Sequence, residues 1–241
     1  MLKKFNLIKN IIVIFILGIS SGLPIVITAS ILKALLHDYN IDLKTIGVLG
    51  LVTMPYSFKF LWSPLIDYCK IPILDKYLGH RKSWILISQI FLIFFIIILG
   101  NVNPQTNMLL FVSVAFLLAF FSATQDICID AYRIRILNLN EQGLGASSTI
   151  YGYRIGMIIS GVGGLYLAEL FSWKVSLLIM GLVILPTALV TIMASKIPDE
   201  NLERKNISLQ QMADLVSFVK NWRYLDGRIP LEKPLPIKPE Q

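Results

Sequence analysis

Five stretches of this sequence contain no Asp, Glu, Lys or Arg, and they constrain its fold more than any other feature. They cover residues 10–32, 84–102, 108–125, 155–168 and 175–195. A helix needs about 20 apolar residues to cross the hydrocarbon core of a bilayer, and most of these stretches meet that need. Only 15% of the residues are charged, whereas soluble domains carry about 25%. The sequence therefore predicts an all-α polytopic membrane protein.

Six membrane-spanning helices are predicted, at about residues 7–36, 45–66, 83–101, 107–128, 146–170 and 174–195. They make up one transmembrane bundle over residues 1–195. Residues 196–241 are predicted to form a tail, in which residues 199–221 make a short amphipathic surface helix. The Pro-rich end of that tail is predicted to be disordered, because it has little apolar surface to bury.

Positively charged residues gather in every second loop, and this asymmetry predicts the orientation in the membrane. Cytoplasmic loops carry an excess of Lys and Arg. On that basis both termini and the loop 67–83 are cytoplasmic, whereas the uncharged loop 101–107 lies on the opposite side. The net charge of +7 reflects the same asymmetry, so we expect no binding to nucleic acid.

Two cations interrupt the predicted second and fifth spans, Lys59 and Arg154. At 1.5 Å per residue, both lie about 10–12 Å inside the cytoplasmic ends of their helices. Ionisable groups are costly in lipid, and those that are retained usually face the protein interior or a watery cavity. The pair is interpreted as a site for an anionic substrate. The alternative is that each cation binds a backbone carbonyl or extends to the nearby interface.

Charged residues also gather at the cytoplasmic ends of the second and fourth spans. Asp126, Asp130 and Arg133 share one face of a helix because of their spacing. A carboxylate at a helix C-terminus needs a cation nearby, and a basic loop segment follows the second span. The predicted cluster, which would latch a cytoplasmic gate, consists of Asp67, Arg81, Lys82, Asp126, Asp130 and Arg133. The alternative is a solvated rim of charges that only sets topology, although Asp126 is the deepest and is assigned to the substrate or proton pathway.

The predicted fifth span has a small residue at every fourth position. The stripe includes Gly152, Gly156, Ser160 and Gly164. Small residues at this spacing let two helix backbones approach closely in a membrane. The stripe therefore predicts a close helical partner without specifying which helix it is; the family resemblance described below implies a helix that this chain does not encode, because the two halves of the family's proteins meet there.

No catalytic triad, phosphate-binding loop or metal-ligand spacing is found in the sequence. His37 and His80 fall in loops on opposite sides of the membrane, and the two cysteines have neither disulfide context nor metal-ligand spacing. We therefore expect neither an enzyme, nor a metal site, nor a bound cofactor.

Several motifs resemble those of a known family, the AmpG-type muropeptide permeases of the major facilitator superfamily. They are SGLP (21–24), LWSPLIDY (61–68), LGHRKSW (78–84), SATQDICIDAYR (122–133) and GYRIGMIISG (152–161). The resemblance implies the amino-terminal, six-transmembrane-helix half of a major facilitator fold. Relative to the superfamily's loop between helices 2 and 3, residues 68–77 are an extension. The match places Gly22, Ala123 and Gln125 in the family's helix 1 and helix 4 motifs, and so in the substrate or proton pathway.

The same resemblance implies proton-driven import of anhydro-muropeptides across the bacterial inner membrane for cell-wall recycling. The implied partners are the lipid bilayer, protons, an anionic small molecule, and a second half-transporter or a second copy of the chain. Three alternatives remain: an acetyl-CoA-type anion transporter, an inactive half-transporter remnant, and a membrane protein that only mediates interactions. Because the resemblance covers only the amino-terminal half, it also implies that the chain is a truncated paralogue of the family.

Overall fold

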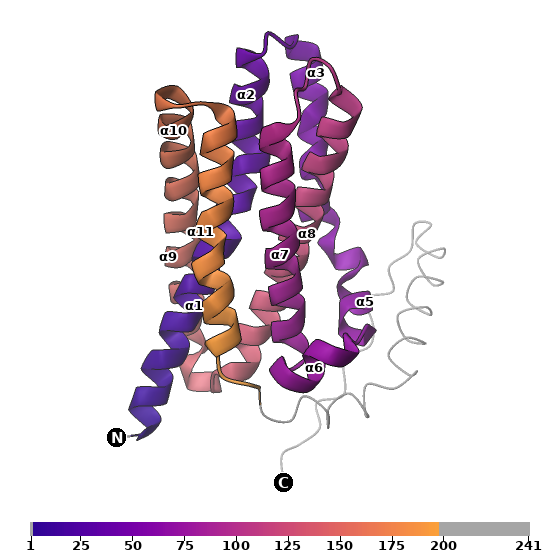
Figure 1. Ribbon diagram of the computed structural model, residues 1–241. Helices are drawn as coiled ribbons and strands as arrows, with labels where there is room; N and C mark the ends of the chain where they lie inside the picture. The colour runs from indigo at the N-terminus through magenta and orange to yellow at the C-terminus, as the bar shows by residue number, and fades with distance from the viewer. Residues whose placement is uncertain (1, 198–241) are drawn as a thin grey trace, which may run out of the picture. The chain divides into compact units, whose positions relative to one another are not determined.

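The computed structural model describes residues 2–197, and every regular element in that range is helical. The predicted tail helix over 199–221 lies outside the described residues. Figure 1 shows the elements, whose bounds are α1 (Leu2–Val26), η1 (Ile27–Ile31), α2 (Leu32–Asp38), α3 (Leu43–Val48), η2 (Leu49–Thr53), α4 (Met54–Phe58), η3 (Lys59–Leu61), α5 (Ser63–Tyr68), α6 (Pro72–Leu78), α7 (His80–Asn101), α8 (Met108–Ile136), η4 (Leu139–Glu141), α9 (Gln142–Ile158), η5 (Ile159–Gly163), α10 (Gly164–Leu170) and α11 (Trp173–Met193).

Four helices in the described range are long and apolar enough to cross a membrane. They are Lys4–Asp38, His80–Asn101, Met108–Ile136 and Trp173–Met193. The first of these runs through α1, a π-helical turn (η1) and α2 without a break. The chain is thus a helical protein that passes through the membrane several times.

The other two predicted spans are not among these four helices, and each has a less regular helical course. Between residues 43 and 68, α4 and α5 each begin with a proline at the first or second position, Pro55 and Pro64. Proline lacks an amide hydrogen and its ring clashes with the preceding turn, so the helix restarts at each one. In the fifth segment, α9, the glycine-rich π turn η5 and α10 follow one another without a break, as α1, η1 and α2 do.

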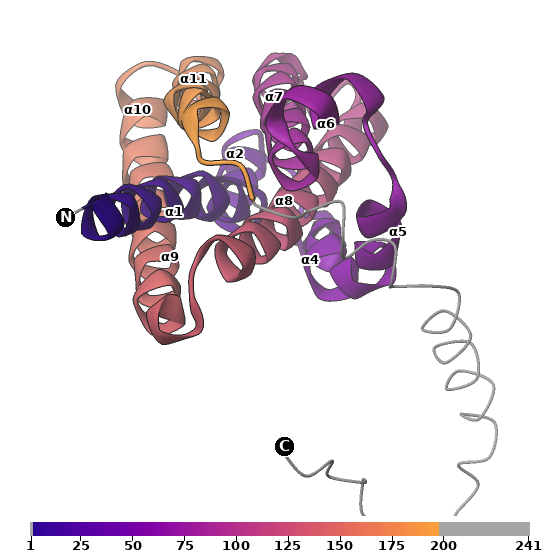
Figure 2. The ribbon, with the colours of Figure 1, turned by 90° about the horizontal axis from the view of Figure 1, so that it is seen from below.

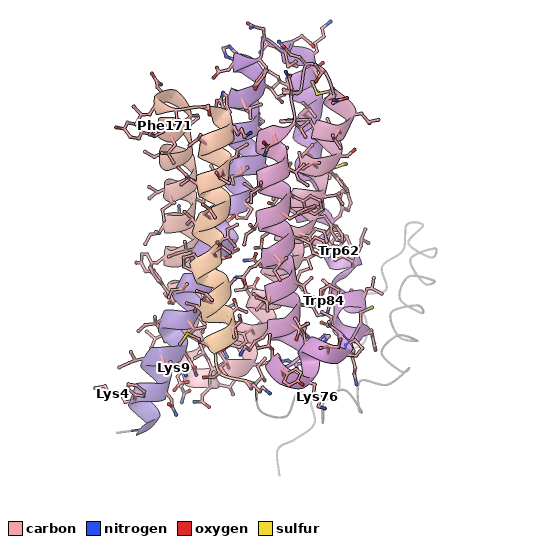
Figure 3. The ribbon with its side chains drawn as sticks, viewed as in Figure 1. Lys4, Lys9, Trp62, Lys76, Trp84 and Phe171 are labelled. Atoms are coloured by element: carbon pink, nitrogen blue, oxygen red, sulfur yellow. The ribbon has the colours of Figure 1, made fainter. Side chains whose placement is uncertain are left out.

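The helices of residues 2–197 pack around α1 and α8. Seen from below, α6, α7 and α11 lie on one side of the bundle, and α4 and α9 lie on the other (Figure 2). Two apolar clusters form the core: a larger one that includes Leu23 and Leu92, and a smaller one around Tyr132. Lys4, Lys9 and Lys76 lie at one end of the bundle, and Phe171 lies at the other (Figure 3).

The closest helix pair in the bundle is α1 with α9, and glycines on both helices make it. A Cβ atom at Gly22, Gly152 or Gly156 would lie less than 3.0 Å from a backbone oxygen of the opposite helix. The Ser148 hydroxyl, about one turn before Gly152 on α9, donates a hydrogen bond to the Ile11 carbonyl of α1. The expectation that the stripe meets a helix outside this chain is therefore wrong. Its partner is α1, and the glycines are already covered.

Candidate functional site

A cavity of about 510 Å³ lies on the side of the bundle that carries α4 and α9. Residues from α1, η3, α8 and α9 line it: Ser21, Lys59, Asp126, Ile129, Asp130, Thr149, Ile150, Tyr153, Arg154 and Met157. Four of these are predicted site residues, and they come from three segments that are distant in sequence. The structure therefore brings Lys59, Asp126, Asp130 and Arg154 to one place.

The two cations of the cavity have different surroundings from its carboxylates. Within residues 2–197, neither Lys59 nor Arg154 forms an ion pair or a hydrogen bond through its side chain. Lys59 attracts the Asp126 carboxylate through space without an ion-pair contact. Asp130, in contrast, is paired with Arg133 at 3.5 Å. The cavity thus presents an ammonium and a guanidinium group whose charges are free to meet a ligand.

Asp126 is held in place from α1. The Ser21 hydroxyl donates a short hydrogen bond to Oδ1 of Asp126. One residue earlier on both helices, Nε2 of Gln125 donates to Oγ of Ser20 at 2.9 Å. Two consecutive residues of α8 are therefore bonded to two consecutive residues of α1. Asp126 faces the cavity, whereas Gln125 points into the bundle.

Gln125 belongs to a buried polar network that joins four helices. Its partner Ser20 also accepts a hydrogen bond from Gln89 of α7, which bonds in turn to Thr187 and Thr191 of α11. All five side chains are buried. Buried polar groups need such partners, since an unpaired one costs about 1–3 kcal/mol. The network links α1 and α8 with α7 and α11.

The structure does not place the three residues implied by the family motifs on the cavity wall. Ala123 and Gln125 are fully buried in the bundle. Gly22 packs against the backbone of Tyr153, so it sets the position of that cavity residue instead of lining the cavity itself. Their assignment to the substrate or proton pathway stays a prediction. In that prediction, the three residues would act through neighbouring residues.

The predicted gate cluster is divided between several partners. Arg81 is paired with Asp67, and Asp130 is paired with Arg133. Lys82 differs from the prediction: its ammonium group donates to the backbone carbonyls of Ile192, at 3.0 Å, and Ala194. These carbonyls belong to the end of α11, where a helix leaves its last C=O groups unbonded. Lys82 therefore stabilises the C-terminal end of α11.

Sequence reasoning missed two of the polar side chains that shape the cavity, Ser21 and Tyr153. Both are next to residues that were singled out, within SGLP and GYRIG. An uncharged side chain in a predicted span gives no signal by itself, because it lacks the energetic cost that makes an ionisable residue stand out there. The contact between Ser21 and Asp126 becomes visible only when α1 and α8 are placed side by side.

Comparison with known proteins agrees with this architecture. Residues 12–232 match the family model described as Major Facilitator Superfamily. The chain belongs to this family. Membership of the Major Facilitator Superfamily, a family of transporters, points to a transporter and not to an enzyme.

Three curated relatives illustrate the similarity within the superfamily. The anhydromuropeptide permease of Escherichia coli is 37% identical over 207 residues, which cover 86% of this chain and 41% of that protein. A putative transporter AmpG 1 of Rickettsia bellii is 42% identical over 160 residues, covering 66% of this chain and 39% of its own length. A putative transporter AmpG 4 of Rickettsia conorii is 35% identical over 210 residues, covering 86% and 50%. The chain thus spans half or less of the length of these relatives.

Proposed function

We propose that this chain is part of a permease that imports anhydro-muropeptides across the bacterial inner membrane. The observation that carries the proposal is the pair of cations, Lys59 and Arg154, on the wall of one cavity and without an ion-pair partner among the described residues. Muropeptides carry carboxylates, and charge-assisted hydrogen bonds to carboxylates are among the strongest that a protein makes. The similarity to an anhydromuropeptide permease supports the same substrate class.

In this proposal the cavity residues have distinct roles. Lys59 and Arg154 bind a substrate carboxylate. Asp126 carries the coupling proton, because, of the two carboxyl groups on the cavity wall, it is the one without an ion-pair partner among the described residues, and Ser21 holds it. The pairs Asp67–Arg81 and Asp130–Arg133 form and break as the cytoplasmic side closes and opens. Such paired charges suit a gate, since each state can offer them different partners.

A second six-helix unit completes the substrate path in this proposal. Transporters of this kind bind substrate near the middle of the membrane, at the interface of two structural repeats. Arg154 and Asp130 lie on the cavity wall and are exposed in the chain by itself. The unit that covers them is a carboxyl-terminal half or a second copy of the chain. It does not dock on the glycine stripe, because α1 occupies that surface.

Uptake measurements test the proposal. Labelled anhydro-muropeptide is offered to right-side-out membrane vesicles with and without a proton gradient, and with acetyl-CoA as a competitor. We expect gradient-dependent uptake that acetyl-CoA does not inhibit. Lys59→Gln and Arg154→Gln should each raise the KM about ten-fold or more, since a hydrogen bond to a charged group contributes about 1.5–3 kcal/mol. Asp126→Asn should abolish the dependence on the gradient.

Lys33→Gln is the matched control, because Lys33 is an exposed lysine outside the cavity. Inhibition by acetyl-CoA would favour the anion transporter instead. A folded, membrane-inserted chain that takes up nothing, alone or together with a carboxyl-terminal half, would favour an inactive remnant.

A further inference from the structure

The short helix α6 (Pro72–Leu78) exposes an apolar and cationic face. It overlaps residues 68–77, which the family resemblance marks as an extension of the loop that joins the second and third helical segments. Pro72, Ile73, Lys76 and Tyr77 share one side of the helix and are all exposed. Ile73 is 73% exposed and Tyr77 is 68% exposed. One turn of this helix thus presents a large aliphatic side chain and an aromatic side chain to its surroundings.

Four interactions fix the direction of this face. Oδ2 of Asp75 accepts a hydrogen bond from the backbone amide of Ile71 at 3.2 Å, and it lies 3.0 Å from Nδ1 of His80. The other ring nitrogen of His80 lies 2.8 Å from the carbonyl oxygen of Ile66. The Trp84 indole donates to the Cys69 carbonyl at 2.9 Å. α6 is therefore held to the ends of α5 and α7, and its exposed side stays exposed.

The charges around this face are unbalanced toward positive. Lys70 and Lys76 are both exposed. The two acidic residues of the same region are engaged elsewhere, Asp67 with Arg81 and Asp75 with His80. A negatively charged partner would therefore meet two lysines without facing a free carboxylate of this segment.

The position of α6 relative to the spans indicates what this partner is. α7 begins at His80, two residues after α6 ends, and His80 is also the first residue of a candidate membrane span. α6 thus lies where a span meets the aqueous phase. Figure 2 places it with α7 and α11, on the side of the bundle away from α4, α9 and the cavity. That side faces away from the proposed second unit, so lipid surrounds it.

We propose that α6 is an interfacial anchor that binds the headgroups of anionic phospholipids. Ile73 and Tyr77 enter the boundary between headgroups and acyl chains, where Tyr is enriched in membrane proteins. Lys70 and Lys76 contact the phosphates, since lysines next to a membrane attract anionic lipids. The proposal concerns the attachment of the loop to the membrane and does not depend on the transported substrate.

The exposed thiol of Cys69, one residue before Lys70, offers a native probe of this contact, because the other cysteine, Cys128, is buried. A fluorescent maleimide on Cys69 of the full chain is studied in nanodiscs of phosphatidylcholine with added phosphatidylglycerol. In separate samples, one or the other of the two lipids carries bromine atoms, which quench the fluorescence of the label. We expect brominated phosphatidylglycerol to quench more strongly. Each of Lys70→Gln and Lys76→Gln should lower that preference about five-fold, which corresponds to about 1 kcal/mol per lysine near an anionic surface.

Variants separate the apolar contribution from the charges. Ile73→Ser with Tyr77→Ser should reduce quenching by both brominated lipids and increase quenching by aqueous iodide. Lys44→Gln and Leu43→Ser, which change exposed residues of α3, should change neither signal. Equal quenching by the two brominated lipids would overturn the anionic preference. Strong iodide quenching with no lipid quenching in the unchanged protein would overturn the anchor altogether and leave another segment of protein as the occupant of this face.

Discussion

A substitution of Gly22 by alanine tests the seam between α1 and α9 most directly. The seam is the row of close backbone contacts that Gly22, Gly152 and Gly156 make between these two helices. The added Cβ would lie less than 3.0 Å from three backbone atoms of Tyr153: its carbonyl oxygen, its carbonyl carbon and its Cα. Ordinary contacts of a Cβ lie at 3.4–4 Å. A flexible side chain could move out of the way, but a helix backbone moves only with the whole helix. Gly22→Ala therefore forces α9 away from α1.

We expect this change to lower the free energy of unfolding by about 1–3 kcal/mol, the usual cost of inserting a methyl group into a well-packed site. The measurement is a titration with sodium dodecyl sulfate in mixed micelles, followed by circular dichroism. Gly143→Ala is the matched control: it lies in α9, and a Cβ there would meet nothing within 4 Å. Alanine favours a helix over glycine by about 0.5–1 kcal/mol, so this variant should be at least as stable as the unchanged protein.

A double variant sharpens the test. Gly22→Ala and Gly156→Ala open the same seam, since a Cβ at Gly156 would meet the Ile19 backbone of α1. Once one methyl group has separated the helices, the second costs less stability. The double variant should therefore lose less free energy of unfolding than the two single variants lose in total. A Gly22→Ala protein as stable as the unchanged chain would refute the close seam. Full additivity would refute the idea that both methyl groups act on one interface.

Two further predictions concern the cytoplasmic end and the orientation. Lys82→Met should lower the free energy of unfolding by about 1.5 kcal/mol or more, because it removes charged hydrogen bonds to the Ile192 and Ala194 carbonyls. The control is Lys44→Met, which changes an exposed lysine. An equal loss of stability in both variants would contradict the prediction. For the orientation, a cysteine at Asn103 in an otherwise unchanged chain should react with an impermeant maleimide in cells whose outer membrane alone is permeabilised, whereas Cys69 should react only after the inner membrane is opened. The reverse result would invert the predicted topology.

The membrane-spanning character of this chain is predictable because a bilayer allows few backbone structures. An apolar segment of sufficient length must satisfy its own backbone hydrogen bonds, so it forms a helix. The uncharged runs therefore predict the helical class and the approximate positions of the segments. The interruptions at Pro55 and Pro64 follow from local chemistry, but a hydropathy pattern is insensitive to them.

The site is predictable only as far as charge reveals it. Lys59, Asp126 and Arg154 stand out because an ionisable group in a span is costly, and all three line the cavity. The partner of the glycine stripe could not be predicted, since a stripe specifies a close approach without specifying which helix approaches. The same holds for Lys82: its charge suggested an acidic partner, but the carbonyls at the end of α11 satisfy it.

The two π turns, η1 and η5, have a consequence for aligning this chain with other sequences. A spacing of four residues drifts by about 40° per step around an α-helix, so a four-residue stripe would leave the α1–α9 interface within a few turns. A π turn holds more residues than an α turn, so it rotates the following side chains in the direction opposite to this drift. Gly164, which follows η5, therefore still faces Ile31 at the end of η1. Each π turn is thus equivalent to one inserted residue. A homologous helix without it can be superposed only with a one-residue gap at that point, and an alignment that omits the gap would assign every later side chain to the wrong side of the helix.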